Sequence, residues 1–207
     1  MKGPVYWHPW LYRRVMTRLY GQIGYEERYR VVAKEVPPDC DVVDLCAGDG
    51  RLRHYLPGSV RYTAVDMNEG FLRDLQRQGV ATVAANLRQT IPPGACVVMM
   101  AALYHFMPNH IALVRRAIEA ASDRFILTEP VENVTSAGGS LRARIGAWAS
   151  DPGDGSGGQR LCAADLEQLL RDVPGGRIAH RAREWVMVWD KRPTSQTQRA
   201  TATPSAR

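Results

Sequence analysis

Residues 42–51, Val-Val-Asp-Leu-Cys-Ala-Gly-Asp-Gly-Arg, decide the fold of this chain. The apolar residues at the start of this stretch can bury a strand of a parallel sheet, and Asp44 follows them directly. Gly48 and Gly50 then permit a tight turn, and the residues after them can open a helix. A strand, an acid, a glycine turn and a helix, in this order, are typical of a nucleotide site at the carboxyl edge of an open α/β sheet.

The acids of this stretch indicate which kind of nucleotide binds. A dinucleotide places its pyrophosphate on the helix N-terminus, where negative side chains are unfavourable. Here Asp44 and Asp49 flank the turn, and Arg53 stands where a dinucleotide fingerprint has its third glycine. A ligand that carries an ammonium and a sulfonium group tolerates both acids. S-adenosylmethionine (SAM) is such a ligand, and the sequence therefore favours SAM over a dinucleotide.

Composition indicates one globular domain. The chain has 207 residues, of which 45% are hydrophobic and 23% charged, and this length allows a substantial core. No run of about 18 apolar residues predicts a membrane span, and the N-terminus lacks the apolar region of a signal peptide. Four cysteines without a Cys-x-x-Cys pair argue against a zinc site or a disulfide framework and fit a reducing compartment. We therefore expect a cytoplasmic protein without a membrane or metal partner.

The net charge of +6 raises the question of nucleic-acid binding. The basic residues are spread along the chain without a long basic run, and nearly all of them are arginine. This distribution argues against nucleic acid as the partner and favours a small molecule.

The apolar pattern predicts alternating strands and helices after an N-terminal helical segment. Residues 5–36 show helical spacing with a break at Gly21–Gly24, and Pro37-Pro38 ends the helix. Predicted strands are 41–46, 62–66, 81–84, 96–102 and 124–129, and predicted helices start at about 50 and cover 70–78 and 109–121. The alternation predicts a doubly wound parallel sheet with helices on both faces.

The C-terminal third has a different pattern. Helices are predicted at 140–150 and 163–172, with a glycine-rich loop at 151–158. Residues 177–184 and 185–190 are predicted to pair as an antiparallel hairpin, and the tail from Pro193 lacks the apolar content of a folded segment.

Five segments resemble the class I SAM-dependent methyltransferase superfamily in that family's order and spacing. They are residues 42–50, 62–66, 84–87, 96–106 and 126–130. The resemblance implies a Rossmann-like, doubly wound, seven-stranded sheet that is mostly parallel, with a C-terminal antiparallel hairpin. It also implies SAM as the methyl donor and S-adenosylhomocysteine (SAH) as the product. The expected parts are an N-terminal helical lid (1–37), a SAM-binding methyltransferase domain (38–192) and a disordered tail (193–207).

The resemblance assigns the cofactor to acids at two strand ends and to the glycine turn between them. Asp44 is expected to hold the amino group of the methionine moiety, directly or through water. Asp66 is expected to accept hydrogen bonds from both ribose hydroxyls. The alternative for each acid is a helix cap. Gly48 and Gly50 let the backbone approach the ligand, although a simple tight turn needs them equally. Cys46 replaces the family's first glycine with another small residue, and we do not expect it to be a nucleophile.

Further cofactor contacts are expected outside this turn. Met67 is expected on the adenine face, with core packing as the alternative. Asn86 is expected to accept a hydrogen bond from the adenine amino group, or to form an ordinary turn, and Leu87 to offer its backbone N–H to the ring. Ala102, at the end of a strand, is expected to face the methyl donor. Tyr20 is expected to meet the SAM carboxylate, unless its helix only packs on the sheet.

The acceptor is expected beside His105, which is the candidate general base. A methyl acceptor such as a hydroxyl or an amine must lose a proton, and histidine has a suitable pKa. The alternative is a structural histidine packed behind the cofactor. Residues expected to contact the acceptor lie after two strands or in the N-terminal helical segment: Tyr104, Glu129, Asn133, Trp10 and Tyr12.

Three functions fit these residues. The first is transfer of the SAM methyl group to an O, N or C atom of a small molecule. The second is methylation of RNA or protein, which the basic charge favours. The third is a SAM-binding protein that does not methylate, such as a cyclase or a partner subunit, because a fold does not fix a function. The end of strand 96–102 lacks the Pro-Pro-aromatic signature of enzymes that methylate nucleic-acid amino groups, so the first function is expected.

Overall fold

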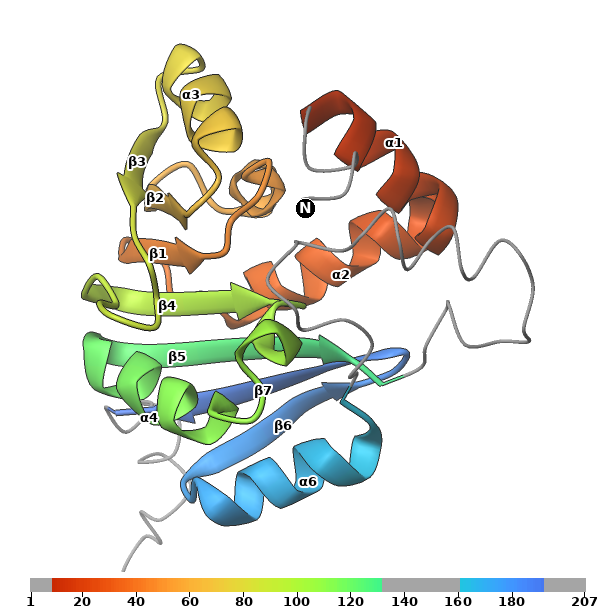
Figure 1. The fold of residues 1–207 in the computed structure, drawn as a ribbon, viewed down its shortest axis with the longest axis vertical. Coiled ribbons are helices and arrows are strands. Elements are labelled where there is room, and N and C mark those ends of the chain that lie inside the picture. The colour runs from red at the N-terminus through yellow and green to blue at the C-terminus, as the bar shows by residue number, and fades with distance from the viewer. Residues whose placement is uncertain (1–8, 132–160, 192–207) are drawn as a thin grey trace, which may run out of the picture.

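Seven strands form one sheet (Figure 1) in a computed structural model that describes residues 9–131 and 161–191. The strands are β1 (Asp41–Leu45), β2 (Arg61–Asp66), β3 (Ala81–Ala84), β4 (Gly94–Met100), β5 (Ala121–Pro130), β6 (Gly176–Arg181) and β7 (Glu184–Asp190). Their spatial order is β3-β2-β1-β4-β5-β7-β6. Each neighbouring pair among β3, β2, β1, β4 and β5 is parallel, and β7 runs antiparallel to both β5 and β6. The predicted mostly parallel sheet with a C-terminal antiparallel hairpin is confirmed.

The helices agree with the predicted segments except at two places. They are α1 (Pro9–Tyr20), α2 (Gln22–Glu35), α3 (Glu69–Arg77), α4 (His110–Ala120), α6 (Ala163–Asp172) and the short 3-10 helices η2 (Arg51–Tyr55) and η3 (Leu103–Phe106). The break between α1 and α2 falls at Gly21 alone, and Gly24 lies within α2. The helix predicted from residue 50 is only the five-residue η2, because Leu56 precedes Pro57 and is extended.

Two apolar cores lie on opposite faces of the sheet, because side chains alternate along each strand. Val43 and Leu45 of β1 belong to the core that also contains apolar residues of α4 and α6. Val42 belongs to the other core, which α2 covers. Helices therefore cover both faces, as expected for a doubly wound sheet. The alternation also places Asp44 on the α2 face.

The order of the strands reverses between β1 and β4. The chain leaves β1 toward β2 and β3, then returns to β4 on the other side of β1. At such a point, ligands bind outside the carboxyl ends of the strands. Figure 1 shows α1 and α2 beside this edge, where β1 and β4 end. The candidate site therefore lies where the N-terminal helices meet the carboxyl edge.

Several predictions concern residues that the structure does not describe. Asn133, the helix predicted at 140–150, the loop at 151–158 and the tail from Pro193 lie outside the described residues, as do the side chains of Tyr12 and Tyr20. Within the described ranges, none of the helices is both long and apolar enough to cross a bilayer.

Candidate functional site

A carboxylate from β2 closes the glycine turn that follows β1. The Oδ2 atom of Asp66 accepts a hydrogen bond from the Gly48 N–H at 2.9 Å, and Oδ1 accepts one from the Asn68 N–H at 2.8 Å. Because β1 and β2 are adjacent and parallel, their carboxyl ends meet at this edge. These bonds fix the Asp66 carboxylate beside the glycine turn, and a carboxylate is the acceptor type that hydroxyl groups require.

The turn needs left-handed backbone conformations at three positions. The φ angles of Cys46, Gly48 and Gly50 are 57°, 55° and 64°. A Cβ atom on Gly50 would lie 2.7 Å from the Cδ2 atom of Leu75, so space and conformation both require glycine there. Cys46 adopts the conformation that glycine takes freely, at a cost of about 1–2 kcal/mol. The turn is therefore retained although the family's first glycine is absent.

Asp44, at the end of β1, is a buried acid that Tyr62 holds. The Tyr62 hydroxyl donates a hydrogen bond to its Oδ2 atom at 2.6 Å, and only 3% of the residue is exposed. Burial, with smaller contributions from the charges of Asp66 and Asp49, raises the pKa of Asp44 to about 7, although the bond from Tyr62 favours the ionised form. A cation placed beside Asp44 would favour the ionised form further.

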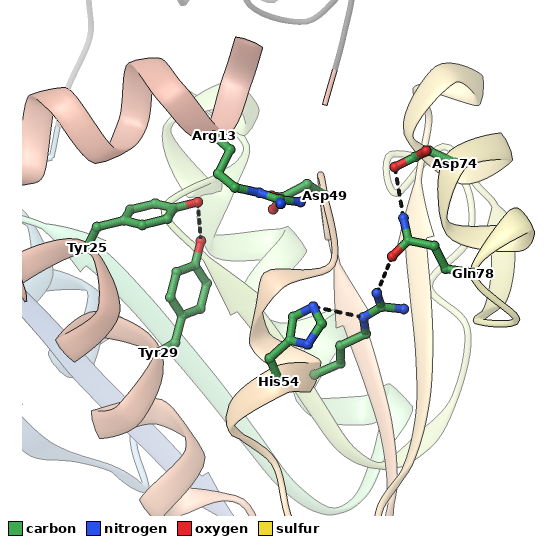
Figure 2. A network of polar contacts seen from close by, with 8 residues as sticks. Arg13, Tyr25, Tyr29, Asp49, His54, Asp74 and Gln78 are labelled. Atoms are coloured by element: carbon green, nitrogen blue, oxygen red, sulfur yellow. Dashed lines mark hydrogen bonds and ion pairs between the residues drawn. The ribbon is translucent and has the colours of Figure 1, made fainter. Parts of the chain in front are cut away.

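The third acid of the site pairs with the N-terminal helix. Figure 2 shows Arg13 reaching from α1 to Asp49 in the glycine turn, and its Nε atom lies 3.1 Å from Oδ2. The side chain of Asp49 is 2% exposed, whereas that of Arg13 is 45% exposed. The Arg13 side chain is therefore partly accessible to a second anion, such as a ligand carboxylate. The role of this segment as a lid stays a prediction.

The β4 edge is organised by Glu129 of β5. Its side chain is almost fully buried, and Oε1 accepts a hydrogen bond from the Leu103 N–H at 2.6 Å. This bond fixes the start of η3, which carries Tyr104 and His105 with ring centroids 3.8 Å apart. Ala102, directly before η3, is buried. Glu129 thus positions the backbone of η3, and its predicted contact with the acceptor stays a prediction.

A second turn, after β3, is held by a helix arginine. Asn86 Oδ1 accepts a hydrogen bond from the Arg88 N–H at 3.0 Å. Arg116 of α4 donates to the carbonyl oxygens of Leu87, Arg88 and Gln89 at 3.1, 3.0 and 2.8 Å. The turn that sequence reasoning assigned to the adenine is therefore fixed from outside by one side chain.

Comparison with known proteins finds solved structures that are similar to this chain. No family model matches the chain, and no curated protein matches it in sequence. Magnesium protoporphyrin IX methyltransferase from Synechocystis, solved with bound SAH, matches 84% of this chain and 84% of its own, at 17% identity and a TM-score of 0.58. An O-methyltransferase family protein from Burkholderia thailandensis matches 88% of this chain at 14% identity and a TM-score of 0.62. Mitomycin 7-O-methyltransferase matches 81% of this chain at 14% identity and a TM-score of 0.57.

The chain has the class I SAM-dependent methyltransferase fold. It spans 55% of the mitomycin enzyme's chain and 59% of the Burkholderia protein's chain. In this methyltransferase fold, the two strand-end acids and the glycine turn that the sequence singled out come together at one edge of the sheet. Two other predicted contacts, Met67 and Trp10, lie at the surface, and each is 62% exposed. The ligand contacts of all these residues stay predictions.

Three residues of the site were not found from the sequence. Arg13, Tyr62 and Arg116 each fix an element of the site through a partner that is 18 or more residues away in the chain. A signal for Tyr62 existed, because it opens the predicted strand 62–66, which ends in Asp66. Burial and the charges of Asp66, Asp44 and Glu129 raise the pKa of the Cys46 thiol well above its usual value, so Cys46 stays a protonated thiol.

The described ranges contain no candidate site for a metal ion. Among those residues, no group of three or more histidine, cysteine or acidic side chains is placed to hold a metal ion.

Proposed function

We propose that this protein transfers a methyl group from SAM to a small-molecule acceptor. One observation carries the proposal: the Asp66 carboxylate is hydrogen-bonded to the Gly48 amide beside the buried Asp44, at the carboxyl ends of two adjacent parallel strands. Acid, glycine turn and acid at one edge match the amino acid, sulfonium and ribose parts of SAM in order. The similar structure from Synechocystis contains bound SAH, which supports the same ligand here.

The residues at this edge suit the chemical groups of the cofactor. The carboxylate of Asp66 suits the ribose hydroxyls as an acceptor, and that of Asp44 suits the ammonium group as a charge-assisted acceptor. The part of Arg13 that is exposed suits the methionine carboxylate, in place of the Tyr20 contact expected from sequence. The turn at Asn86 and Leu87 offers backbone and amide groups to the adenine. When bound, SAM supplies a methyl group attached to a positively charged sulfur.

The excess of acids supports a cationic ligand. Asp44, Asp66 and Glu129 all act electrostatically on Cys46, and Asp49 lies in the same turn. Arg13 pairs with Asp49, whereas Asp44, Asp66 and Glu129 accept hydrogen bonds from Tyr62, Gly48 and Leu103. A pyrophosphate would be repelled by this set, whereas an ammonium and a sulfonium are attracted.

We propose His105 as the base that takes the acceptor proton. It lies on η3, whose start is fixed by Glu129, and its backbone carbonyl accepts a hydrogen bond from Arg88 Nη2 at 2.7 Å. Changing His105→Ala should lower turnover by about 100-fold while SAH affinity stays within about twofold. The matched control is His110→Ala, in the next helix, which should leave turnover unchanged. Full activity of His105→Ala on the true acceptor would assign His105 to packing.

A small molecule is favoured over RNA because many arginines act within the structure. Arg115, Arg116 and Arg124 donate hydrogen bonds to backbone carbonyls, and Arg28 forms a buried ion pair with Glu184. These side chains are held by intramolecular partners and do not form a free basic surface. RNA or protein methylation stays the second candidate function on the basis of the net charge of +6.

The deciding experiment has two steps. Calorimetric titration with SAH tests the cofactor, and SAH release from SAM is then measured with panels of small hydroxyl and amine compounds and with RNA. Binding of SAH together with turnover on a small molecule supports the proposal. Turnover on RNA alone would replace it with the second candidate, and binding without turnover on any acceptor would favour a SAM-binding protein that does not methylate. No binding of SAH would refute the cofactor.

A further inference from the structure

Tyr62 and Asp44 form a pair that the proposed reaction does not by itself require. Val42 pairs in register with Tyr62, and Asp44 pairs with Ala64, two residues further along β2. Residues two apart on a strand share a face, so the Tyr62 and Asp44 side chains project to the same side of the sheet. The phenol then extends diagonally to the acid, and its hydroxyl donates to Oδ2 at 2.6 Å.

The hydrogen bond engages one of the two carboxylate oxygens. Oδ2 of Asp44 accepts the hydrogen bond from the phenolic hydroxyl, and Oδ1 lies on the other side of the same planar group. A buried carboxylate with one fixed oxygen has a fixed plane, so the direction in which Oδ1 accepts is set by the protein and not by the ligand. Such an arrangement is preorganised for one further donor.

The surroundings of Asp44 otherwise oppose its negative charge. The residue is buried, and Asp66 and Asp49 are both close enough to disfavour its ionisation, so that its pKa lies at about 7. The Tyr62 bond acts in the opposite direction, because it stabilises the ionised form. Burial and the charge of Asp44 raise the pKa of Tyr62 well above its usual value, so the phenol remains a donor throughout the neutral range.

We propose that Tyr62 is a positioning residue for the amino acid part of the cofactor: its hydrogen bond to Oδ2 fixes the Asp44 carboxylate and leaves Oδ1 to accept the ligand ammonium. The inference rests on the proposed function, since it assumes that an adenosyl amino acid binds at this edge. Under this inference, Tyr62 makes the site prefer ligands that carry an ammonium group over ligands that contain only the adenosine part. The titratable groups that interact with Asp44 are Tyr62 and Asp66 on β2 and Asp49 and Cys46 in the turn. Asp49 in turn pairs with Arg13 of α1 and acts electrostatically on Tyr25 of α2.

The test compares Tyr62→Phe with the wild-type protein against two ligands. SAH carries the ammonium, and 5′-methylthioadenosine has the same adenosine and sulfur but lacks the amino acid part. Loss of one hydrogen bond to a charged group should raise the pKa of Asp44 by about one unit or more. With 7 as the wild-type pKa and a rise of one unit, SAH affinity should fall about ninefold at pH 6 and about twofold at pH 8. Affinity for 5′-methylthioadenosine should stay within about twofold at both pH values.

The pH dependence distinguishes positioning from packing. The amino group of SAH titrates in the same way whichever protein is present, so its titration cancels in the ratio of the wild-type and Tyr62→Phe affinities. The matched control is Tyr29→Phe, which removes a buried hydroxyl that donates to Tyr25 at 3.2 Å on the same face of the sheet. This variant should leave both ligands unaffected. In an Asp44→Asn background, Tyr62→Phe should cause no further loss of SAH affinity.

Two results would overturn the inference while the proposed function stands. One is a decrease in SAH affinity in Tyr62→Phe that is the same at pH 6 and pH 8. The other is an equal decrease in the affinity for 5′-methylthioadenosine. Either result would mean that Tyr62 acts through packing. Wild-type protein that fails to bind SAH would instead refute the proposed function.

Discussion

Asp66 is the residue on which the structure and the proposed cofactor site both depend, so Asp66→Ala gives a sharp prediction. The change removes the acceptor for two backbone N–H groups, those of Gly48 and Asn68. A hydrogen bond to a charged group contributes about 1.5–3 kcal/mol, and water replaces part of this because Asp66 is only half-buried. We expect a loss of about 2–4 kcal/mol in the free energy of unfolding, measured by urea denaturation without ligand.

A matched variant in the same loop separates the ligand from the loop. Asn68→Ala also removes a side-chain acceptor for a backbone N–H, that of Gly70 at 2.9 Å, where it caps α3. It should cost about 1 kcal/mol of stability and leave SAH binding within about twofold. Asp66→Ala should weaken SAH by at least about 100-fold, since two ribose hydroxyls lose a charged acceptor.

The assay that decides the ribose contact compares 5′-methylthioadenosine with its 2′-deoxy analogue by calorimetry. Wild-type protein and Asn68→Ala should both prefer the ribose form. Asp66→Ala should bind the two ligands equally, because the acceptor of the 2′-hydroxyl is gone. An undiminished preference for ribose in Asp66→Ala would refute the assignment, whatever the variant does to stability.

Three further predictions concern buried charges and the adenine turn. Because the pKa of Asp44 in the folded protein, about 7, lies above its usual value of 3.8, folding is favoured at low pH and this contribution is lost as pH rises from about 4 to 7. The amide in Asp44→Asn does not titrate, so the free energy of unfolding of this variant, measured with urea, should rise by up to about 4 kcal/mol relative to wild type between pH 4 and pH 7.5. A difference between the two proteins that is the same at both pH values would contradict this prediction. Changing either partner of the buried Arg28–Glu184 pair to Met should cost about 3–5 kcal/mol in urea unfolding, and the double change less than either; additive losses would contradict this. Arg116→Ala should weaken 5′-methylthioadenosine about tenfold, while Arg115→Ala on the same helix, which donates to the Asp172 carbonyl, should not; equal effects would remove the role of Arg116.

The sheet was predictable because its signals are local. A buried parallel strand is a short apolar run, and an acid or glycine directly after it marks the carboxyl end, as at Asp44 and Asp66. The hairpin was predicted from contiguous strands 177–184 and 185–190, and the structure places its turn between β6, which ends at Arg181, and β7, which begins at Glu184. The helix predicted from about residue 50 is present as η2, and Pro57 limits it to the five residues Arg51–Tyr55.

The contacts that shape the site were not predictable in the same way. The bond from Tyr62 to Asp44 depends on the register of β2 against β1, and one step of slippage would move the phenol to the other face. The hydrogen bond from the Leu103 N–H to Glu129 joins residues 26 positions apart in the chain, so neither segment alone indicates it. Arg13 was one arginine among many, and only the position of α1 brings it to Asp49.

By itself, the sequence determined the class of fold, the edge of the sheet at which the site lies, and the acids and glycines that form it. These depend on the alternation of apolar runs with turns and on the residue that follows each strand, which are properties of neighbouring residues. The tertiary structure alone decided which side chains support those acids, through Tyr62, Arg13 and Arg116. Such pairings join elements that are distant in the chain, and they exist only once strand register and helix packing have fixed their distances.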